Sequence, residues 1–75
     1  MVSDDQEYIR MPGTVVAVER NAVFRVEIEG GLQVMAKAAG RMRRGRKIRI
    51  LSGDSVEVEV STYDPTKGRI VWRHR

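Results

Sequence analysis

The chain has 75 residues, no cysteine and a formal net charge of +4, from 14 Lys and Arg against 10 Asp and Glu. A domain of this length buries only about 60–65% of the surface that its unfolded chain exposes. Without cysteine it forms neither disulfides nor a thiolate metal site, and this composition fits a reducing, intracellular compartment. We expect neither a signal peptide nor a membrane segment, because residues 1–8 are acidic rather than basic and apolar, and no apolar run approaches ~20 residues.

Residues 1–8 are predicted to form a flexible tail, because their acids suit a solubilising chain end, and residues 9–75 a single cytoplasmic domain. Along that domain, apolar and polar residues alternate with the period of a strand that has one buried face. The alternation is clearest at Phe24, Val26 and Ile28. Five strands are expected, over residues 13–19, 24–29, 32–37, 55–60 and 69–73.

Turn-forming residues separate these strands. Arg20 and Asn21 follow the first strand, and Gly30–Gly31 can take the positive φ of a tight hairpin between the second and the third. Ser52–Asp54 precedes the fourth strand, and Tyr63–Gly68 forms a longer turn before the last. The pattern therefore predicts an all-β chain.

Residues 38–47 lack the alternation, and their alanines, methionine and arginines are tolerable helix formers. A helical turn that starts near Gly40 and ends at Gly45 is expected. Five short antiparallel strands with a helical turn between strands 3 and 4 are the layout of the OB-fold, a small barrel whose middle strands and loops bind oligonucleotides. An SH3-like barrel is the alternative, and the helical insert favours the OB-fold.

The positive charge is concentrated in one stretch that contains no acid. Residues 1–36 carry six acids against three bases and residues 50–75 carry four of each, so the excess comes from residues 37–49. Such clustering indicates a surface for a polyanion, with nucleic acid as the leading candidate, and arginine predominates, whose planar fork pairs with phosphate. The seven basic residues are Lys37, Arg41, Arg43, Arg44, Arg46, Lys47 and Arg49.

Three later basic residues, Lys67, Arg69 and Arg73, either extend this surface or form a solvated face. Among the aromatic residues, Phe24 and Trp72 share a face with apolar strand residues and are predicted to lie in the core. Tyr8 and Tyr63 lie in or beside loops, where a tyrosine either packs or stacks on a base. With so few exposed aromatics, we expect binding to depend on phosphates and shape rather than on stacking.

Catalytic chemistry finds little support in the sequence. His74 is the only histidine and lies one residue from the C-terminus. Without cysteine, the chain offers neither a nucleophile and base pair nor a clustered set of metal ligands. We expect no enzyme activity, no metal and no cofactor.

Three strings, at residues 40–44, 48–54 and 63–73, resemble bacterial translation initiation factor one, and residues 13–15 and 24–27 extend the similarity to about residues 9–75. The resemblance implies a monomeric, cytoplasmic OB domain of the S1 type that binds the small ribosomal subunit at its decoding (A) site. There it would contact ribosomal RNA next to a ribosomal protein and cooperate with initiation factors two and three.

Residue by residue, the resemblance assigns Arg41, Arg43, Arg44 and Arg49 to the family's basic loop, which enters the minor groove of the decoding helix and helps to flip out two adenines. It assigns Lys67, Arg69 and Arg73 to the C-terminal turn and strand, and Arg25 to a further family arginine. The chain departs from the family in residues 45–47, where the loop is one residue longer and Lys47 replaces an aromatic, and in Lys37, which replaces a histidine.

Two other functions fit the same surface. A general RNA chaperone or antiterminator of the OB-fold class would bind unstructured oligonucleotides as well as ribosomal subunits, and the shortage of exposed aromatics argues against it. A protein-interaction barrel would grip an acidic partner through the arginines.

Overall fold

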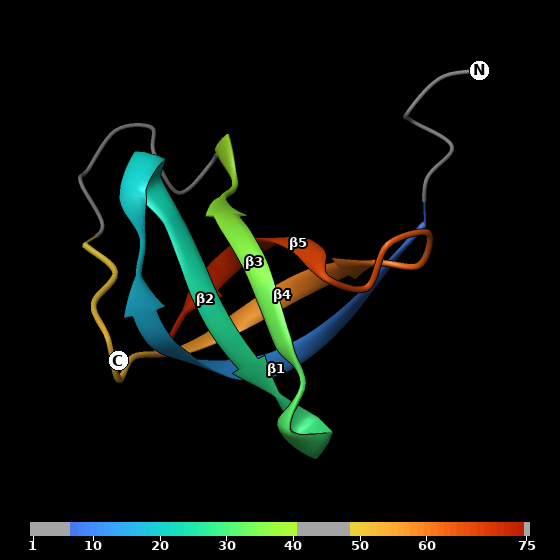
Figure 1. Ribbon diagram of the computed structural model, residues 1–75, viewed down its shortest axis with the longest axis horizontal. Coiled ribbons are helices and arrows are strands. Elements are labelled where there is room, and N and C mark those ends of the chain that lie inside the picture. Colours follow the sequence, from blue (N-terminus) through green and yellow to red (C-terminus); the bar gives the residue numbers. More distant parts are fainter. Residues whose placement is uncertain (1–6, 41–48, 75) are drawn as a thin grey trace.

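The computed structural model describes residues 7–40 and 49–74, which form a closed barrel of five strands (Figure 1). Around the barrel the strands follow the order β1-β2-β3-β5-β4, and all neighbours are antiparallel except β3 and β5, which run parallel. The predicted all-β, five-stranded OB barrel is confirmed. The strands are β1 Tyr8–Val18, β2 Val23–Ile28, β3 Gln33–Ala38, β4 Ser55–Ser61 and β5 Lys67–Arg73.

Strand β1 begins five residues before the predicted start and pairs with two neighbours. Residues 8–14 pair with β4, and residues 13–18 pair with β2. Pro12 breaks the sequence pattern, yet a proline fits here because it pairs with Glu57 of β4 on one side only, so its missing N–H can face the unpaired side. The two short turns Arg20–Ala22 and Glu29–Gly31 connect β1 to β2 and β2 to β3, and Gly30 and Gly31 have the positive φ expected of them.

Valine and isoleucine side chains from every strand fill the barrel, and Phe24 lies among them as predicted. Trp72 does not: the prediction that it lies in the core is wrong, because its side chain is 53% exposed. Ile70 and Val71 are both buried, and β5 shifts its register against β4 between Glu57 and Val58. This β-bulge adds one inward residue, so the alternation beyond it places Trp72 outside.

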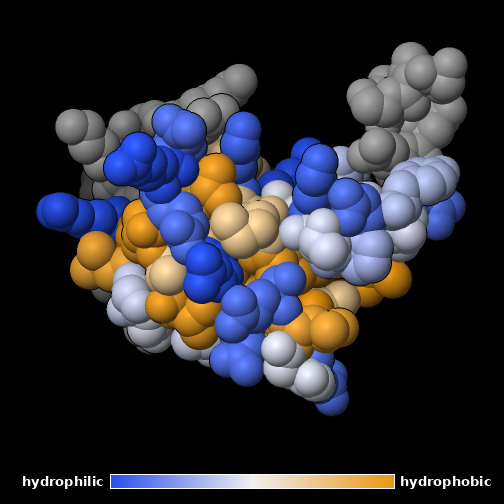
Figure 2. All heavy atoms as spheres, viewed as in Figure 1, coloured by the Kyte–Doolittle hydropathy of each residue, from blue (hydrophilic) through white to orange (hydrophobic). Residues whose placement is uncertain are grey.

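The described residues contain no helix long and apolar enough to cross a membrane. Apart from Gly40, the helical turn predicted over residues 40–45 lies outside the described residues. Figure 2 shows that hydrophilic residues are scattered among apolar ones over the face that carries β2 and β3.

Replacing Gly68 by alanine is expected to destabilise the barrel. A Cβ at this position would lie 2.6 Å from the carbonyl oxygen of Glu59 and 3.1 Å from Cγ1 of Val34. Because a backbone oxygen in a paired strand cannot turn away, Gly68→Ala should lower the free energy of unfolding by about 1–3 kcal/mol, as overpacking does. Denaturant unfolding measures this. Gly40→Ala is the control: its Cβ would meet nothing within 4 Å, and equal losses in the two variants would contradict the prediction.

Candidate nucleic-acid interface

The parallel pairing of β3 with β5 places three predicted site residues side by side. Lys37 lies opposite Arg69, and Met35 lies opposite Lys67. All three basic side chains are exposed. Thus Lys67 and Arg69, whose relation to the basic stretch the sequence leaves open, adjoin Lys37 in the structure.

Arg49 and Arg73 form a second group, at the far end of β5. Nη1 of Arg73 donates a hydrogen bond to the carbonyl oxygen of Arg49 and lies 3.9 Å from Oδ2 of Asp54. That same carboxylate oxygen accepts a hydrogen bond of 2.8 Å from the backbone N–H of Leu51. Arg73 is half-buried and Arg49 is exposed. Arg73 therefore fixes the backbone of Arg49 and leaves the Arg49 side chain at the surface.

Lys37 and Arg49 stand on either side of the segment that carries the remaining predicted site residues. Arg41, Arg43, Arg44, Arg46 and Lys47 lie outside the described residues, and their part in binding stays a prediction.

Carboxylates accompany several of the arginines. Nε of Arg69 lies 2.8 Å from Oε1 of Glu59, and Nη2 of Arg25 lies 2.5 Å from Oε2 of Glu19. Both pairs lie at the surface and are partly open to solvent. Surface ion pairs contribute only about 0–1 kcal/mol each, so a phosphate can compete for the cation. Lys37 makes no ion pair within the part of the chain that the structure describes. The same holds for Arg49, so Lys37 and Arg49 carry the two least compensated charges of the described group.

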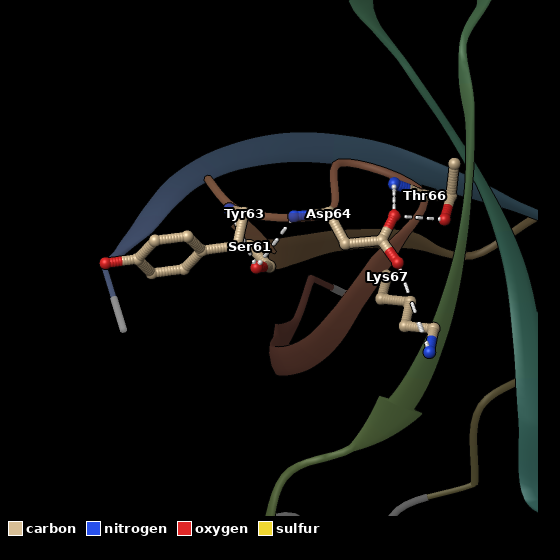
Figure 3. Close-up of polar contacts among 5 residues, drawn as sticks. All are labelled: Ser61, Tyr63, Asp64, Thr66 and Lys67. Atoms are coloured by element: carbon tan, nitrogen blue, oxygen red, sulfur yellow. Dashed lines mark hydrogen bonds and ion pairs between the residues drawn. The ribbon is translucent and has the colours of Figure 1, made fainter. Parts of the chain in front are cut away.

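The turn between β4 and β5 is held by its own side chains (Figure 3). Oγ of Ser61, which is buried, accepts hydrogen bonds from the backbone N–H groups of Tyr63 and Asp64, at 3.1 and 3.2 Å. Oδ1 of Asp64 accepts hydrogen bonds from the hydroxyl of Thr66, at 2.6 Å, and from its backbone N–H, at 3.2 Å. These bonds fix the direction in which Tyr63 and Lys67 leave the turn.

The hydroxyl and the backbone N–H of Thr66, together with the charge of Lys67, hold the pKa of Asp64 below its ordinary value of 3.8. The pKa of Asp64 is lower in the folded state than in the unfolded state, so the ionised carboxylate stabilises the fold. This stabilisation is complete above pH 3.8 and is lost as the pH falls through the folded-state pKa. We expect Thr66→Val to raise the pKa of Asp64 toward 3.8, as measured by NMR titration. An unchanged pKa would mean that the Thr66 hydroxyl is not the main cause.

The comparison with known families decides what this barrel is. The family model of translation initiation factor 1A / IF-1 matches residues 2–75. The chain belongs to the translation initiation factor IF-1 family.

Individual relatives agree with this assignment. The chain is 51% identical over 75 residues to translation initiation factor IF-1 of Rickettsia bellii, covering 100% of this chain and 99% of the relative. It is 48% identical over 71 residues to the IF-1 of Ureaplasma parvum, covering 95% of each. The solution structure of the initiation factor IF-1 from a Wolbachia endosymbiont of Brugia malayi superposes with a TM-score of 0.76 at 38% identity, over 100% of this chain and 90% of that one.

IF-1 membership confirms the resemblance drawn from the three strings, and the relatives are named initiation factors rather than enzymes. The barrel itself also occurs inside a larger protein. YjeQ of Thermotoga maritima superposes on 89% of this chain with a TM-score of 0.71 and 32% identity, but only 23% of the YjeQ chain takes part. The fold alone therefore does not identify an initiation factor, and the full-length matches to IF-1 proteins do.

Proposed function

We propose that this chain is a monomeric initiation factor that binds the small ribosomal subunit at its decoding (A) site in the cytoplasm. Its basic surface faces ribosomal RNA, beside an adjacent ribosomal protein, and the bound factor cooperates with initiation factors two and three. The observation that carries the proposal is the 51% identity to an IF-1 protein over the whole chain. Lys37 and Arg49, which flank the stretch 41–48, are exposed, so their positive charges are available to the phosphates of RNA.

The factor recognises the charge and the shape of the RNA through a basic stretch that is attached to a rigid barrel. The strand pairings of Lys37 and the hydrogen bond from Arg73 to Arg49 hold the two ends of the basic stretch to the barrel. Arginine and lysine side chains in that stretch pair with backbone phosphates, and planar guanidinium groups occupy the space left by unstacked bases. No covalent step is required. A factor held there also excludes a tRNA from the decoding groove.

Co-sedimentation with isolated small subunits tests the proposal. The wild type should pellet with the subunits, and the Arg43→Ala/Arg49→Ala double variant should pellet much less. The single variants Arg49→Ala and Arg10→Ala are a matched pair, because each removes one arginine and Arg10 lies on β1 next to Glu57, outside the basic stretch. Arg10→Ala should pellet like the wild type.

Two results would contradict the proposal. Equal co-sedimentation of the wild type and the double variant would move the site elsewhere. Displacement of the wild type from subunits by an equal concentration of unstructured oligonucleotide would instead indicate a general RNA chaperone.

A further inference from the structure

Met35 is an exposed methionine on the outer face of β3, and the proposed function gives it no part. Its side chain is 39% exposed. Met11, on β1, is the other methionine that the structure describes, and it is partly buried and packs against the core. A thioether in solvent is open to oxidation, whereas a thioether packed against a core is shielded. Of these two methionines, Met35 is therefore the one that an oxidant reaches.

Strand pairing surrounds Met35 with basic residues. β3 runs between β2 and β5 (Figure 1), and Met35 lies opposite Arg25 on one side and Lys67 on the other. Lys37 is two residues along β3 and so lies on the same face, where it is opposite Arg69. Side chains directly opposite one another on paired strands are about 4.5–5.5 Å apart at Cβ. The thioether therefore lies among four cations.

Two of these cations are available to a group that forms at the sulfur. Arg25 and Arg69 are each held by a glutamate. Lys37 has no ion pair within the described residues, and the ammonium of Lys67 is loosely paired, 4.0 Å from Oδ2 of Asp64. In Figure 3 the side chain of Lys67 extends alongside β3. Lys37 and Lys67 thus supply two ammonium groups beside Met35.

Oxidation by a peroxide is a reaction that nearby cations favour. The sulfur lone pair attacks one oxygen of hydrogen peroxide, the O–O bond breaks and an S–O bond forms. The departing hydroxide takes the proton of the new S–OH group and leaves as water, so the sulfur loses two electrons and the peroxide gains them. Negative charge develops on the departing oxygen in the transition state, and a neighbouring ammonium group stabilises that charge.

We propose that Met35 is a site of reversible oxidation by peroxide, at which Lys37 and Lys67 accelerate the reaction and then bind the sulfoxide oxygen. The thioether is a weak hydrogen-bond acceptor, whereas the sulfoxide is polar, so the product occupies ammonium groups that otherwise face phosphate. This consequence for binding rests on the proposed function, and the oxidation itself does not. A methionine sulfoxide reductase restores the thioether and releases the two lysines.

Mass spectrometry of peptides from the folded full chain, after timed exposure to hydrogen peroxide, tests the oxidation. Met35 should be converted to the sulfoxide well before Met11. Lys67→Gln should slow the conversion of Met35 about three- to fourfold at low ionic strength, which is the effect in water of one unit charge about 5–6 Å away. Arg10→Gln is the matched control, because it removes a cation from β1, which does not pair with β3, and it should leave this rate unchanged.

Binding to small subunits tests the consequence. Met35→Gln places a neutral carbonyl oxygen at the end of a side chain of similar length, and Met35→Leu gives an apolar side chain that does not oxidise. Met35→Gln should weaken binding about 2- to 12-fold, the value of about one net hydrogen bond, and Met35→Leu should bind as the wild type does. Hydrogen peroxide should weaken binding by the wild type more than binding by Met35→Leu, and a methionine sulfoxide reductase should reverse that difference.

Other results would overturn the proposal. Equal rates of oxidation at Met35 and Met11 would show that the exposed position has no preference. Equal rates at Met35 in the wild type and in Lys67→Gln would show that the cation takes no part. Equal binding of small subunits by Met35→Gln and Met35→Leu would show that an oxygen at this position does not occupy the lysines.

Failure of this inference is distinguishable from failure of the proposed function, because oxidation is measured on the free protein. If the wild type binds small subunits and Met35 is oxidised no faster than Met11, only the oxidation site is rejected. If Met35 is oxidised first and the wild type binds no subunits, the proposed function and the consequence for binding are rejected together, and the oxidation site stands.

Discussion

Truncating Ile70 to alanine is expected to lower the free energy of unfolding by about 2–5 kcal/mol, the usual cost of emptying a fully buried isoleucine site. Ile70 has no exposed surface, and β3 and β4 pair with its strand on both sides, so little room exists for neighbours to close the cavity. A chain of 75 residues has a total stability of only about 4–11 kcal/mol at typical values per residue. The variant should therefore be partly unfolded near its working temperature.

Ile9→Ala is the matched control, because it removes the same atoms from a side chain that is 55% exposed on β1. Its loss should stay below about 1 kcal/mol. Thermal and denaturant unfolding of the two variants compare them directly, with the melting temperature falling by about 4–8 °C for each kcal/mol in a domain of this size. Similar losses in the two variants would mean that Ile70 is not at the centre of the core.

Binding to small ribosomal subunits is expected to weaken steeply with salt. If the basic surface neutralises about five phosphates, the plot of log affinity against log salt concentration should have a slope on the order of −4, from about 0.7–0.9 per contact. Between about 50 and 200 mM salt the affinity should then fall about 250-fold. A slope near zero would reject binding through phosphates.

The Lys37→Ala variant tests whether Lys37 itself contributes to the salt dependence. Lys37 is exposed and lies beside Arg69, and it has no ion pair among the described residues, so its charge is available to a phosphate. Its removal should reduce the magnitude of the slope by about 0.7–0.9. Arg10→Ala removes a cation of β1 that lies 3.6 Å from Glu57, and it should leave the slope as it is. A slope that responds equally to both variants would mean that only net charge matters.

The strands were predictable because a barrel wall buries one face, so the alternation at Phe24, Val26 and Ile28 is the direct imprint of the core. Two predictions were wrong, the start of β1 and the burial of Trp72, for physical reasons that the alternation of apolar and polar residues does not reveal. Pro12 interrupts the pattern inside β1, where pairing on one side tolerates it. The bulge at β5 adds one inward residue and turns Trp72 outward, and nothing in the local sequence marks where a strand shifts against its partner.

The basic stretch was predictable as a charged surface, because its seven cations are close together in the sequence and no acid lies among them. The residues that lie next to this stretch in the folded chain were not predictable. Lys67 and Arg69 adjoin Lys37 through the parallel pairing of β3 with β5, a contact between residues far apart in the chain. Tyr8 and Ser61, at the start of β1 and the end of β4, are brought together in the same way. Proximity of this kind comes from the closure of the barrel.

Chemical probing of small-subunit ribosomal RNA, with and without the protein, tests the central claim most directly. The account predicts protection confined to the decoding region when the wild type is bound, and loss of that protection with the Arg43→Ala/Arg49→Ala variant. Protection elsewhere, or protection of the decoding region that the double variant leaves intact, would contradict it.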